Sequence, residues 1–247
     1  MKTMLITGGS RGIGAATALL AAKEGYAVIV NYYRNKNAAD AIVSQIKNER
    51  GTAVAIQADI AKEQDVARLF NESKCVFGNL NVLVNNAGIL EPQMKFESMS
   101  MDRIINIFTT NVFAQFLCTQ EAIKQMALSK GGNGGAIVNI SSLAAQSGAP
   151  GEYIDYASSK GAIDTFTIGL SKEVANEGIR VNAVRPAFIY TDIHANGGEP
   201  GRVDRIKNTI PLKRGGQAKE VAEAILWLAS EKSSYCTGTF IDVSGGK

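Results

Sequence analysis

The feature of this 247-residue sequence that most constrains its fold is a regular alternation of short apolar runs with helical segments. The runs are nearly continuous in Val, Ile, Leu and Ala, a pattern typical of strands buried on both faces of a parallel sheet. We expect strands at 3–7, 27–32, 52–58, 81–86, 136–141, 180–184 and 238–243, and helices at 12–24, 37–49, 62–77, 100–128, 156–176 and 217–230. The alternation predicts an α/β fold: a doubly wound, Rossmann-type parallel sheet of about seven strands flanked by helices, in a single domain spanning 1–247.

Composition and charge argue against several classes of protein. The net charge is only +3, and Lys and Arg are dispersed, so neither nucleic acid nor a membrane surface is an expected partner. No apolar run approaches the roughly 18 residues that span a bilayer. The N-terminal sequence MKTMLITGGS is too short in apolar residues for a signal-peptide core, and we expect a cytoplasmic protein.

Metal and triad chemistry gain no support from the cysteines and the histidine. Cys75, Cys118 and Cys236 are scattered, and no CxxC pair is present. The single histidine, His194, lies in TDIHANGGEP, which reads as a mobile loop. We therefore predict no metal site, and a Ser-His-Asp mechanism would depend on that one residue.

A glycine-rich turn directly follows the first strand. Residues 7–14 read TGGSRGIG, and a helix begins at once. Glycine lets a backbone approach a pyrophosphate closely, and the N-terminus of the helix offers free N–H groups to that anion. The spacing is neither GxGxxG nor a Walker loop, and the alternative is a turn with no ligand. The context predicts a dinucleotide site that includes Gly8, Ser10, Arg11, Gly12, Ile13 and Gly14.

The end of the second strand bears on the choice of dinucleotide. An acidic residue there would bind the ribose 2′-OH of NAD, whereas an arginine accepts the 2′-phosphate of NADP. The segment VNYYRNK contains Tyr32 and Arg34 but no acidic residue, and Arg11 can reach the same region. We predict NADP as cofactor; the alternative is that Arg34 is a solvated loop residue. Asp59 and Ile60, after the third strand, are placed to meet the adenine, although Asp59 suits a helix N-cap equally well.

The segment GEYIDYASSK raises the question of which tyrosine acts with Lys160. Residues four apart share one helix face, so Tyr156 pairs with Lys160, whereas Tyr153 has Ala157 at that offset. A phenol has a pKa of about 10, and a neighbouring ammonium lowers it. Taken alone, the YxxxK spacing is weak, because an ordinary helix surface gives the same pattern.

Other polar residues strengthen the interpretation. Ser141 and Ser142 follow the fifth strand, where a hydroxyl can bond a substrate oxygen. The sequence NNAG ends the fourth strand, and Asn111 lies inside the predicted helix 100–128, an unfavourable place for an amide. A buried helical Asn suggests a water-binding or backbone-bending role.

These motifs together resemble the short-chain dehydrogenase/reductase family over essentially the whole chain. The family's TGxxxGxG falls on Thr7, Gly8, Gly12 and Gly14, and its NNAG ends in Asn86, Ala87 and Gly88. The resemblance implies that Tyr156 donates and accepts the proton, that Lys160 lowers its pKa and binds the nicotinamide ribose, that Ser142 orients the carbonyl, and that Asn111 holds a water. It also implies cofactor contacts at Pro186, Ile189 and Thr191, and a homotetramer or homodimer built through the long helices and the C-terminal strand.

The sequence departs from the family pattern in two places. Ala187 replaces the usual glycine after Pro186, which narrows the space beside the nicotinamide. The interval from Ser142 to Tyr156 is one residue longer than in many members, so Glu152 and Tyr153 become candidate substrate contacts at the rim.

The predicted activity is reversible hydride transfer between NADP(H) and a secondary alcohol or a ketone or aldehyde, in which the protein positions the substrate and delivers a proton. The polar, glycine-containing segment 190–212 suggests a lid over a sugar or polyol. One alternative, a 3-oxoacyl-[acyl-carrier-protein] reductase, would need a basic patch from Arg103, Lys124, Lys130, Arg202, Arg205 and Lys207, which dispersed, solvated charges would not form. Another is a non-catalytic NADPH-binding regulator.

Overall fold

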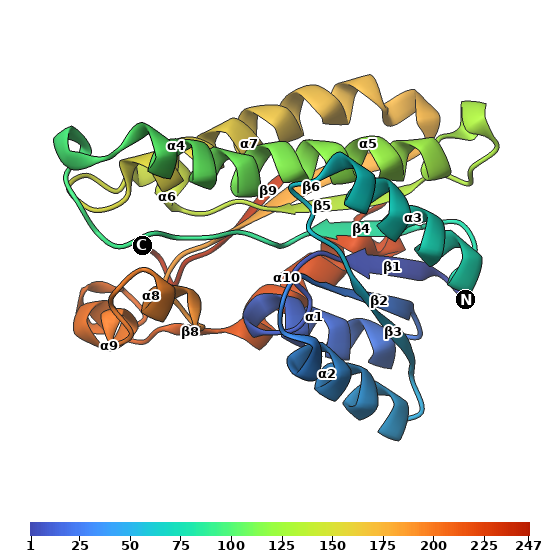
Figure 1. The fold of residues 1–247 in the computed structure, drawn as a ribbon, viewed down its shortest axis with the longest axis horizontal. Helices are drawn as coiled ribbons and strands as arrows, with labels where there is room; N and C mark the ends of the chain where they lie inside the picture. The colour runs from blue at the N-terminus through green and yellow to red at the C-terminus, as the bar shows by residue number, and fades with distance from the viewer.

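The computed structural model describes residues 1–247, and its centre is one seven-stranded parallel sheet (Figure 1). The strands are β1 (Thr3–Ile6), β2 (Ala27–Tyr32), β3 (Thr52–Gln57), β4 (Val82–Asn85), β5 (Gly135–Ile140), β6 (Ile179–Pro186) and β9 (Phe240–Val243). They lie in the order β3-β2-β1-β4-β5-β6-β9, and every pair is parallel. The order reverses between β1 and β4, and ligands of such sheets bind outside the carboxyl ends of the strands at this point.

Helices cover both faces of the sheet (Figure 1). One layer holds α1 (Gly12–Lys23), α2 (Lys36–Asn48) and α10 (Ala218–Ala229); the other holds α3 (Glu63–Phe77), α4 (Met101–Phe108), α5 (Ala114–Met126) and α7 (Ile154–Glu173). Each layer encloses its own apolar core. Met4 and Ile6 of β1 point into the first core, and Leu5 points into the second, as alternation along a strand requires.

The predicted α/β fold is confirmed, and each predicted strand lies within two residues of an observed one. The predicted helix 100–128 is observed as an unbroken helical run over 101–126, with one turn that is not α-helical. A π-helical turn, Thr109–Phe113, separates α4 from α5. Single π turns inside α-helices insert an extra residue and often mark functional sites. Here the turn contains Asn111, which is fully buried.

The segment predicted as an open loop is partly structured. It contains β7 (Ile189–Tyr190), α8 (Ile193–Asn196), α9 (Arg202–Ile206) and a 3-10 turn at Lys207–Thr209, and β7 pairs with β8 (Gly216–Gln217). We call residues 190–212 the lid. A short helix α6 (Ala144–Ser147) and 3-10 turns at Phe96–Ser98, Leu128–Lys130, Ala175–Glu177 and Glu231–Ser233 complete the elements. None of the helices combines the length and the apolar character needed to traverse a bilayer.

Candidate active site

A cleft of about 940 Å³ lies along the carboxyl ends of the strands and continues under the lid. It is lined by the glycine turn, the ends of β2, β4, β5 and β6, and the start of α7. Every residue predicted for catalysis or cofactor binding lines this cleft except Gly14 and Asn111, which lie just behind its wall. The sequence prediction and the geometry therefore converge on one place.

The glycine turn has a backbone that side chains would obstruct. Gly8 and Gly12 have φ angles of +61° and +54°, in the left-handed region that favours glycine. A Cβ on Gly14 would lie 2.4 Å from the Gly8 carbonyl oxygen and 2.5 Å from Nδ2 of Asn86. Gly14 thus acts by allowing the turn to close on the helix behind it.

Asn86, predicted as a cofactor contact, also braces this turn. Its Nδ2 donates to the carbonyls of Thr7 (2.9 Å) and Gly8 (3.1 Å). The hydroxyl of Thr7 in turn accepts the backbone N–H groups of Asn86 and Ala87, both at 3.0 Å. These four bonds fix the NNAG segment and the glycine turn to each other, so two motifs far apart in sequence form one rigid wall.

The N-terminus of α1 fits a pyrophosphate. Its N-cap residue, Arg11, makes no side-chain cap, and the first turn contains no acidic residue. The free N–H groups and the positive end of the helix dipole therefore remain available for an anion beside the glycine turn.

Two arginines lie at the adenosine end of the cleft. Arg11 and Arg34 are both exposed, and neither forms an ion pair within the chain. Arg34 lies over the ring of Tyr33, with its Cζ 4.7 Å from the ring centroid. Asp59 also lines the cleft, and its Oδ1 accepts the N–H of Ala61 at 3.1 Å, so it closes a turn and is not the N-cap of α3.

At the other end, α7 presents Tyr156 and Lys160 on one face. Lys160 is 3% exposed, and its Nζ donates to the carbonyl of Ile140 at 2.7 Å and lies 5.6 Å from the centroid of the Tyr156 ring. A Cβ on Gly88 would lie 3.6 Å from that Nζ and 3.3 Å from Oδ1 of Asn111. The amine, the amide and the end of β4 therefore converge on one point.

Asn111 bends the backbone and fixes a loop. Its Oδ1 accepts the N–H of Ile89 at 2.8 Å, and its Nδ2 donates to the carbonyl of Ile89 at 3.0 Å and to Ser159 at 3.2 Å. Asn111 lies in the π turn, which agrees with the expected backbone-bending role, and the water-binding role stays a prediction. The reciprocal bonds to Ile89 join this turn to the loop after β4.

The structure distinguishes the two serines after β5. The hydroxyl of Ser141 donates to Asp164 at 2.6 Å, on the side of α7. Ser142 lines the cleft, where its hydroxyl accepts the N–H of Ala144 at 3.1 Å and approaches the carbonyl of Pro186 at 3.4 Å. Both serines line the cleft, but the Ser141 hydroxyl is already bonded to a carboxylate, so Ser142 is better placed to bond a substrate oxygen.

The sequence predicts that a neighbouring ammonium lowers the pKa of Tyr156, whereas in the cofactor-free protein this pKa is raised. Burial raises the pKa of Tyr156, and only a hydrogen bond with Ser142 acts to lower it. Burial lowers the pKa of Lys160 to about 8, against the opposing effect of Asp164. The Lys160 ammonium donates to the Ile140 carbonyl and is not among the groups that lower the pKa of Tyr156.

Glu152 and Tyr153, the candidate substrate contacts, both line the cleft and are also bonded within the chain, whereas His194 differs from expectation. Tyr153 is buried, and its hydroxyl donates to the carbonyl of Gly197 at 3.2 Å, so it holds the lid. His194 is on α8 and not in a mobile loop; it is buried, and its Nε2 lies 3.0 Å from the carbonyl of Ile189. Glu152 forms an ion pair with Arg202.

The sequence interpretation missed the apolar part of the lining. Leu90, Leu143 and Phe188 all line the cleft near the catalytic residues. Each follows the end of a predicted strand by a few residues. That position is the only feature of the sequence that could have indicated that they line the cleft.

The basic residues weighed as a carrier-binding patch are mostly neutralised. Five of the six form ion pairs: Arg103 with Asp155, Lys124 with Glu121, Arg202 with Glu152, Arg205 with Glu199, and Lys207 with Asp204. Arg103 and Arg202 are also largely buried, at 9% side-chain exposure each, whereas Lys124, Arg205 and Lys207 stay on the surface in exposed ion pairs that are weak.

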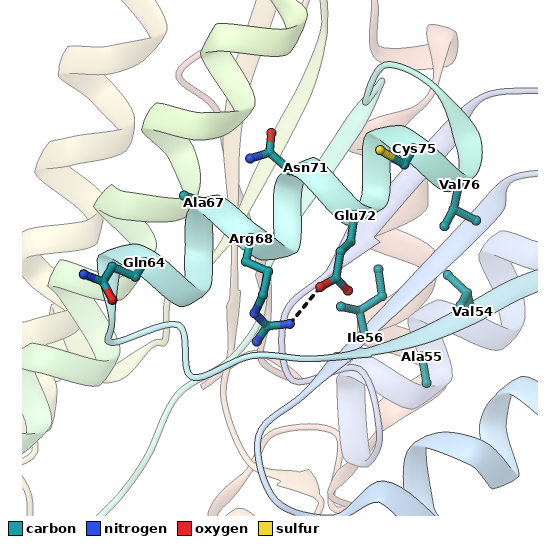
Figure 2. Close-up of a pocket in the computed structure, with 10 residues that line it drawn as sticks. All are labelled: Val54, Ala55, Ile56, Gln64, Ala67, Arg68, Asn71, Glu72, Cys75 and Val76. Carbon is teal, nitrogen blue, oxygen red and sulfur yellow. Dashed lines mark hydrogen bonds and ion pairs between the residues drawn. The ribbon is translucent and has the colours of Figure 1, made fainter.

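A second hollow lies between the edge strand β3 and α3, as Figure 2 shows. Its lining includes Val54, Ile56 and Val76, with an ion pair between Arg68 and Glu72 across part of it. None of the predicted functional residues lies there, and its charged side chains, Arg68 and Glu72, are paired with each other. We therefore assign the chemistry to the cleft at the carboxyl ends of the strands.

Comparison with known proteins agrees with this geometry. Residues 8–247 match the sequence profile of a family described as enoyl-(acyl carrier protein) reductase. The chain is 58% identical over its whole length, and over the whole of the relative, to the uncharacterized oxidoreductase YgfF of Escherichia coli. The chain belongs to the short-chain dehydrogenase/reductase family. It is thus an oxidoreductase by family.

Further relatives cover nearly the whole chain. The 3-oxoacyl-[acyl-carrier-protein] reductase FabG of Staphylococcus epidermidis is 39% identical over 99% of this chain and 98% of the relative. A short-chain dehydrogenase/reductase of Serratia marcescens superposes with a TM-score of 0.91 at 32% identity, covering 99% of this chain and 97% of that one. A dehydrogenase/reductase of Sinorhizobium meliloti has a TM-score of 0.92 at 31% identity, covering 99% and 94%.

Proposed function

We propose that this protein is an NADPH-dependent reductase that converts a small ketone or aldehyde into an alcohol, and that also catalyses the reverse oxidation. The observation that carries the proposal is the convergence of Ser142, Tyr156 and Lys160 in one cleft with the glycine turn. A proton donor, a carbonyl-binding hydroxyl and a buried amine adjoin a dinucleotide-shaped cradle. That set suits delivery of a proton to a carbonyl oxygen while a hydride reaches its carbon.

The preference for NADP rests on charge. Arg11 and Arg34 have no carboxylate partner, and the end of β2 has no acidic side chain to accept the 2′-hydroxyl of NAD. Two guanidinium groups suit a ribose 2′-phosphate through charge-assisted, often bidentate hydrogen bonds. Bound NADPH supplies the hydride.

Each catalytic side chain has one task in this proposal. The Ser142 hydroxyl donates a hydrogen bond to the substrate carbonyl and orients it. The Tyr156 hydroxyl then gives its proton to that oxygen as the carbon accepts the hydride, and in oxidation the phenolate takes the proton back. Lys160 is mostly ammonium at neutral pH because its pKa is about 8. In the complex with cofactor it turns from the Ile140 carbonyl to bind the nicotinamide ribose, and its charge then favours the phenolate of Tyr156. Asn111 acts through Ile89 by holding the loop after β4.

A matched pair of variants tests the proposal. Tyr156→Phe removes the proton donor and should lower kcat by about 10³-fold, within the range for general acid catalysis, while NADPH still binds. Tyr153→Phe removes only the bond to Gly197 and should cost less than about ten-fold, as the loss of one neutral hydrogen bond does. NADPH binding is measured by fluorescence and turnover by absorbance, with sugars, small diketones and acetoacetyl thioesters as substrates. Full turnover by Tyr156→Phe, or cofactor binding with no turnover of any carbonyl by wild type, would contradict the proposal; the second result would favour a regulator.

A second candidate is 3-oxoacyl-[acyl-carrier-protein] reduction. It is favoured by the FabG relatives at 39% identity over nearly the whole chain. The buried ion pairs of Arg103 and Arg202 weigh against it, because an acidic carrier needs cations that are accessible.

We also propose that the protein is cytoplasmic and assembles as a homotetramer or homodimer. Large apolar side chains are exposed on the outer helical layer: Met101 and Ile105 on α4, Phe113 in the π turn, and Ile168 on α7. In Figure 1 this layer lies outermost above the sheet. Exposed apolar patches of this kind suit burial against a second copy.

A further inference from the structure

Three charged side chains of the rim and the lid form a connected group, which we call the clamp: Glu152, Arg202 and Glu199. Glu152 precedes α7, where this chain has its longer interval before Tyr156, and Arg202 and Glu199 belong to the lid. The mechanism proposed above uses none of the three. In Figure 1, α8 and α9 form a lobe below α6 at the carboxyl end of the sheet.

Arg202 is the centre of the clamp. Its side chain is only 9% exposed, and the residue lines the cleft. One terminal nitrogen donates to Glu152 at 3.2 Å and to Glu199 at 3.1 Å, while the other donates to the second oxygen of Glu152. The guanidinium also lies against two rings, with Cζ 5.0 Å from the centroid of Tyr153 and 5.6 Å from that of Phe188. A bidentate pair on a planar guanidinium fixes orientation as well as distance.

Further contacts tie the same three segments together. Gln93, in the segment after β4, donates to Glu199 at 2.6 Å, and the backbone N–H of Met94 donates to the carbonyl of Glu152 at 3.1 Å. Gly197 packs so closely on Leu90 that a Cβ would lie 2.8 Å from it. The segment after β4, the rim and the lid are therefore joined before any substrate is present.

Moving the lid away from the rim has a definite cost. Arg202 separates from Glu152, Glu199 from Gln93, and the Tyr153 hydroxyl from Gly197. Hydrogen bonds to charged groups contribute more than neutral ones, and the clamp loses several at once. A substrate that fits beneath the closed lid avoids this cost, whereas one with a long arm extending out of the cleft must keep the lid displaced.

We propose that the clamp determines substrate choice, so that the enzyme prefers free, small carbonyl compounds over carbonyls carried as thioesters on a pantetheine-type arm. This inference rests on the proposed reductase function and narrows its substrate class. Arg202 is a specificity-determining residue in this account, and Glu152 and Glu199 position it.

The test compares two probes and two kinds of readout. The probes are 2,3-butanedione and S-acetoacetyl pantetheine, which is uncharged and so reports on the arm alone. Loss of a charge-assisted bond corresponds to about a ten-fold change, so Arg202→Met should raise the ratio of kcat/KM for the thioester to that for the diketone by at least about ten-fold. Glu152→Gln, which keeps the bond between Arg202 and Glu199, should shift the ratio in the same direction. Hydrogen exchange of the α8 and α9 amides should quicken in both variants.

Lys207→Met is the matched control, because Lys207 lies on the lid surface and pairs only with Asp204. It should change neither the ratio nor the exchange. An unchanged ratio in the two clamp variants, or wild-type preference for the thioester, would overturn the assignment of specificity. Unchanged exchange would overturn the clamp itself without reference to turnover. Wild type inactive on both probes would instead refute the reductase function, and the specificity with it, while exchange still reported on the clamp. Glu152→Gln decides the matter if Arg202→Met does not fold.

Discussion

The buried amine of Lys160 gives the most quantitative prediction. Lys160 is 3% exposed, and burial lowers the pKa of its amine from 10.5 to about 8. Between those two pH values the unfolded chain binds more protons than the folded one, so the free energy of unfolding rises with pH in that window. A shift of this size corresponds to roughly 3 kcal/mol of destabilisation at neutral pH, most of which disappears by about pH 10.

Lys160→Met isolates this contribution. The variant keeps a side chain of similar length but cannot take up a proton. Its free energy of unfolding therefore lacks the rise with pH that Lys160 causes in wild type. It also loses the bond to the Ile140 carbonyl, a cost of about 1 kcal/mol that does not change across the window. The unfolding free energy of wild type minus that of the variant should therefore increase by about 2–3 kcal/mol from pH 7 to pH 10.

The assay is urea unfolding of the cofactor-free protein followed by circular dichroism at several pH values. Protein concentration is held fixed, because association would otherwise shift the apparent stability. Taking the difference between the two proteins cancels the titration of all other groups. Curves that run parallel from pH 7 to pH 10 would refute the argument, because they would mean that the amine has an ordinary pKa in the fold. In wild type, NADPH affinity should also weaken above about pH 8, as the ammonium that binds the ribose is lost.

Three further outcomes are expected. Arg34→Ala should weaken NADPH binding by about 10- to 100-fold and leave NADH binding nearly unchanged, since a charge-assisted phosphate contact contributes about 1.5–3 kcal/mol; equal losses for both cofactors, in fluorescence titration, would argue against a 2′-phosphate site. Gly14→Ala, whose Cβ would lie 2.4 Å from the Gly8 carbonyl oxygen, should lower stability by about 1–3 kcal/mol and abolish cofactor binding, and a variant with the wild-type melting temperature would show that the turn yields. Phe113→Glu should reduce the assembly to a smaller species in light scattering if the outer helical layer is an interface, and an unchanged mass would exclude Phe113 from it.

The sheet could be predicted from sequence because burial on both faces leaves an unambiguous pattern. Strand β2, Ala27–Tyr32, is buried at every position, and the prediction matched its bounds. The cleft followed from topology alone, since parallel strands bring their carboxyl ends to one edge. The spacing between Tyr156 and Lys160 likewise follows from helix geometry and needs no tertiary information.

Other features depend on contacts that the linear sequence does not contain. Asn111, in the π turn, bonds both backbone groups of Ile89 in the loop after β4, a contact between segments 22 residues apart. Charge counting could not reveal that Arg202 finds two carboxylates, one from its own lid and one from the rim. The spacing placed the Lys160 amine near the phenol of Tyr156 but did not show that the amine donates to the Ile140 carbonyl. The sequence therefore did not predict that burial raises the pKa of Tyr156.

Leu90 and Leu143 show a related limit of prediction from sequence. Each follows a strand end, where the sequence prediction looked for polar chemistry, and each contributes apolar wall to the cleft instead.

The lining of the cleft extends from Gly8 to Lys247. As the polypeptide leaves the ribosome, the glycine turn therefore emerges well before the lid. The neighbour that completes the sheet beside β6 is β9, which is also made late. Such long-range pairings slow folding and leave apolar edges uncovered meanwhile. If translation stops early, the released chain therefore contains the glycine motif but lacks the lid and β9, and so cannot form the complete cleft.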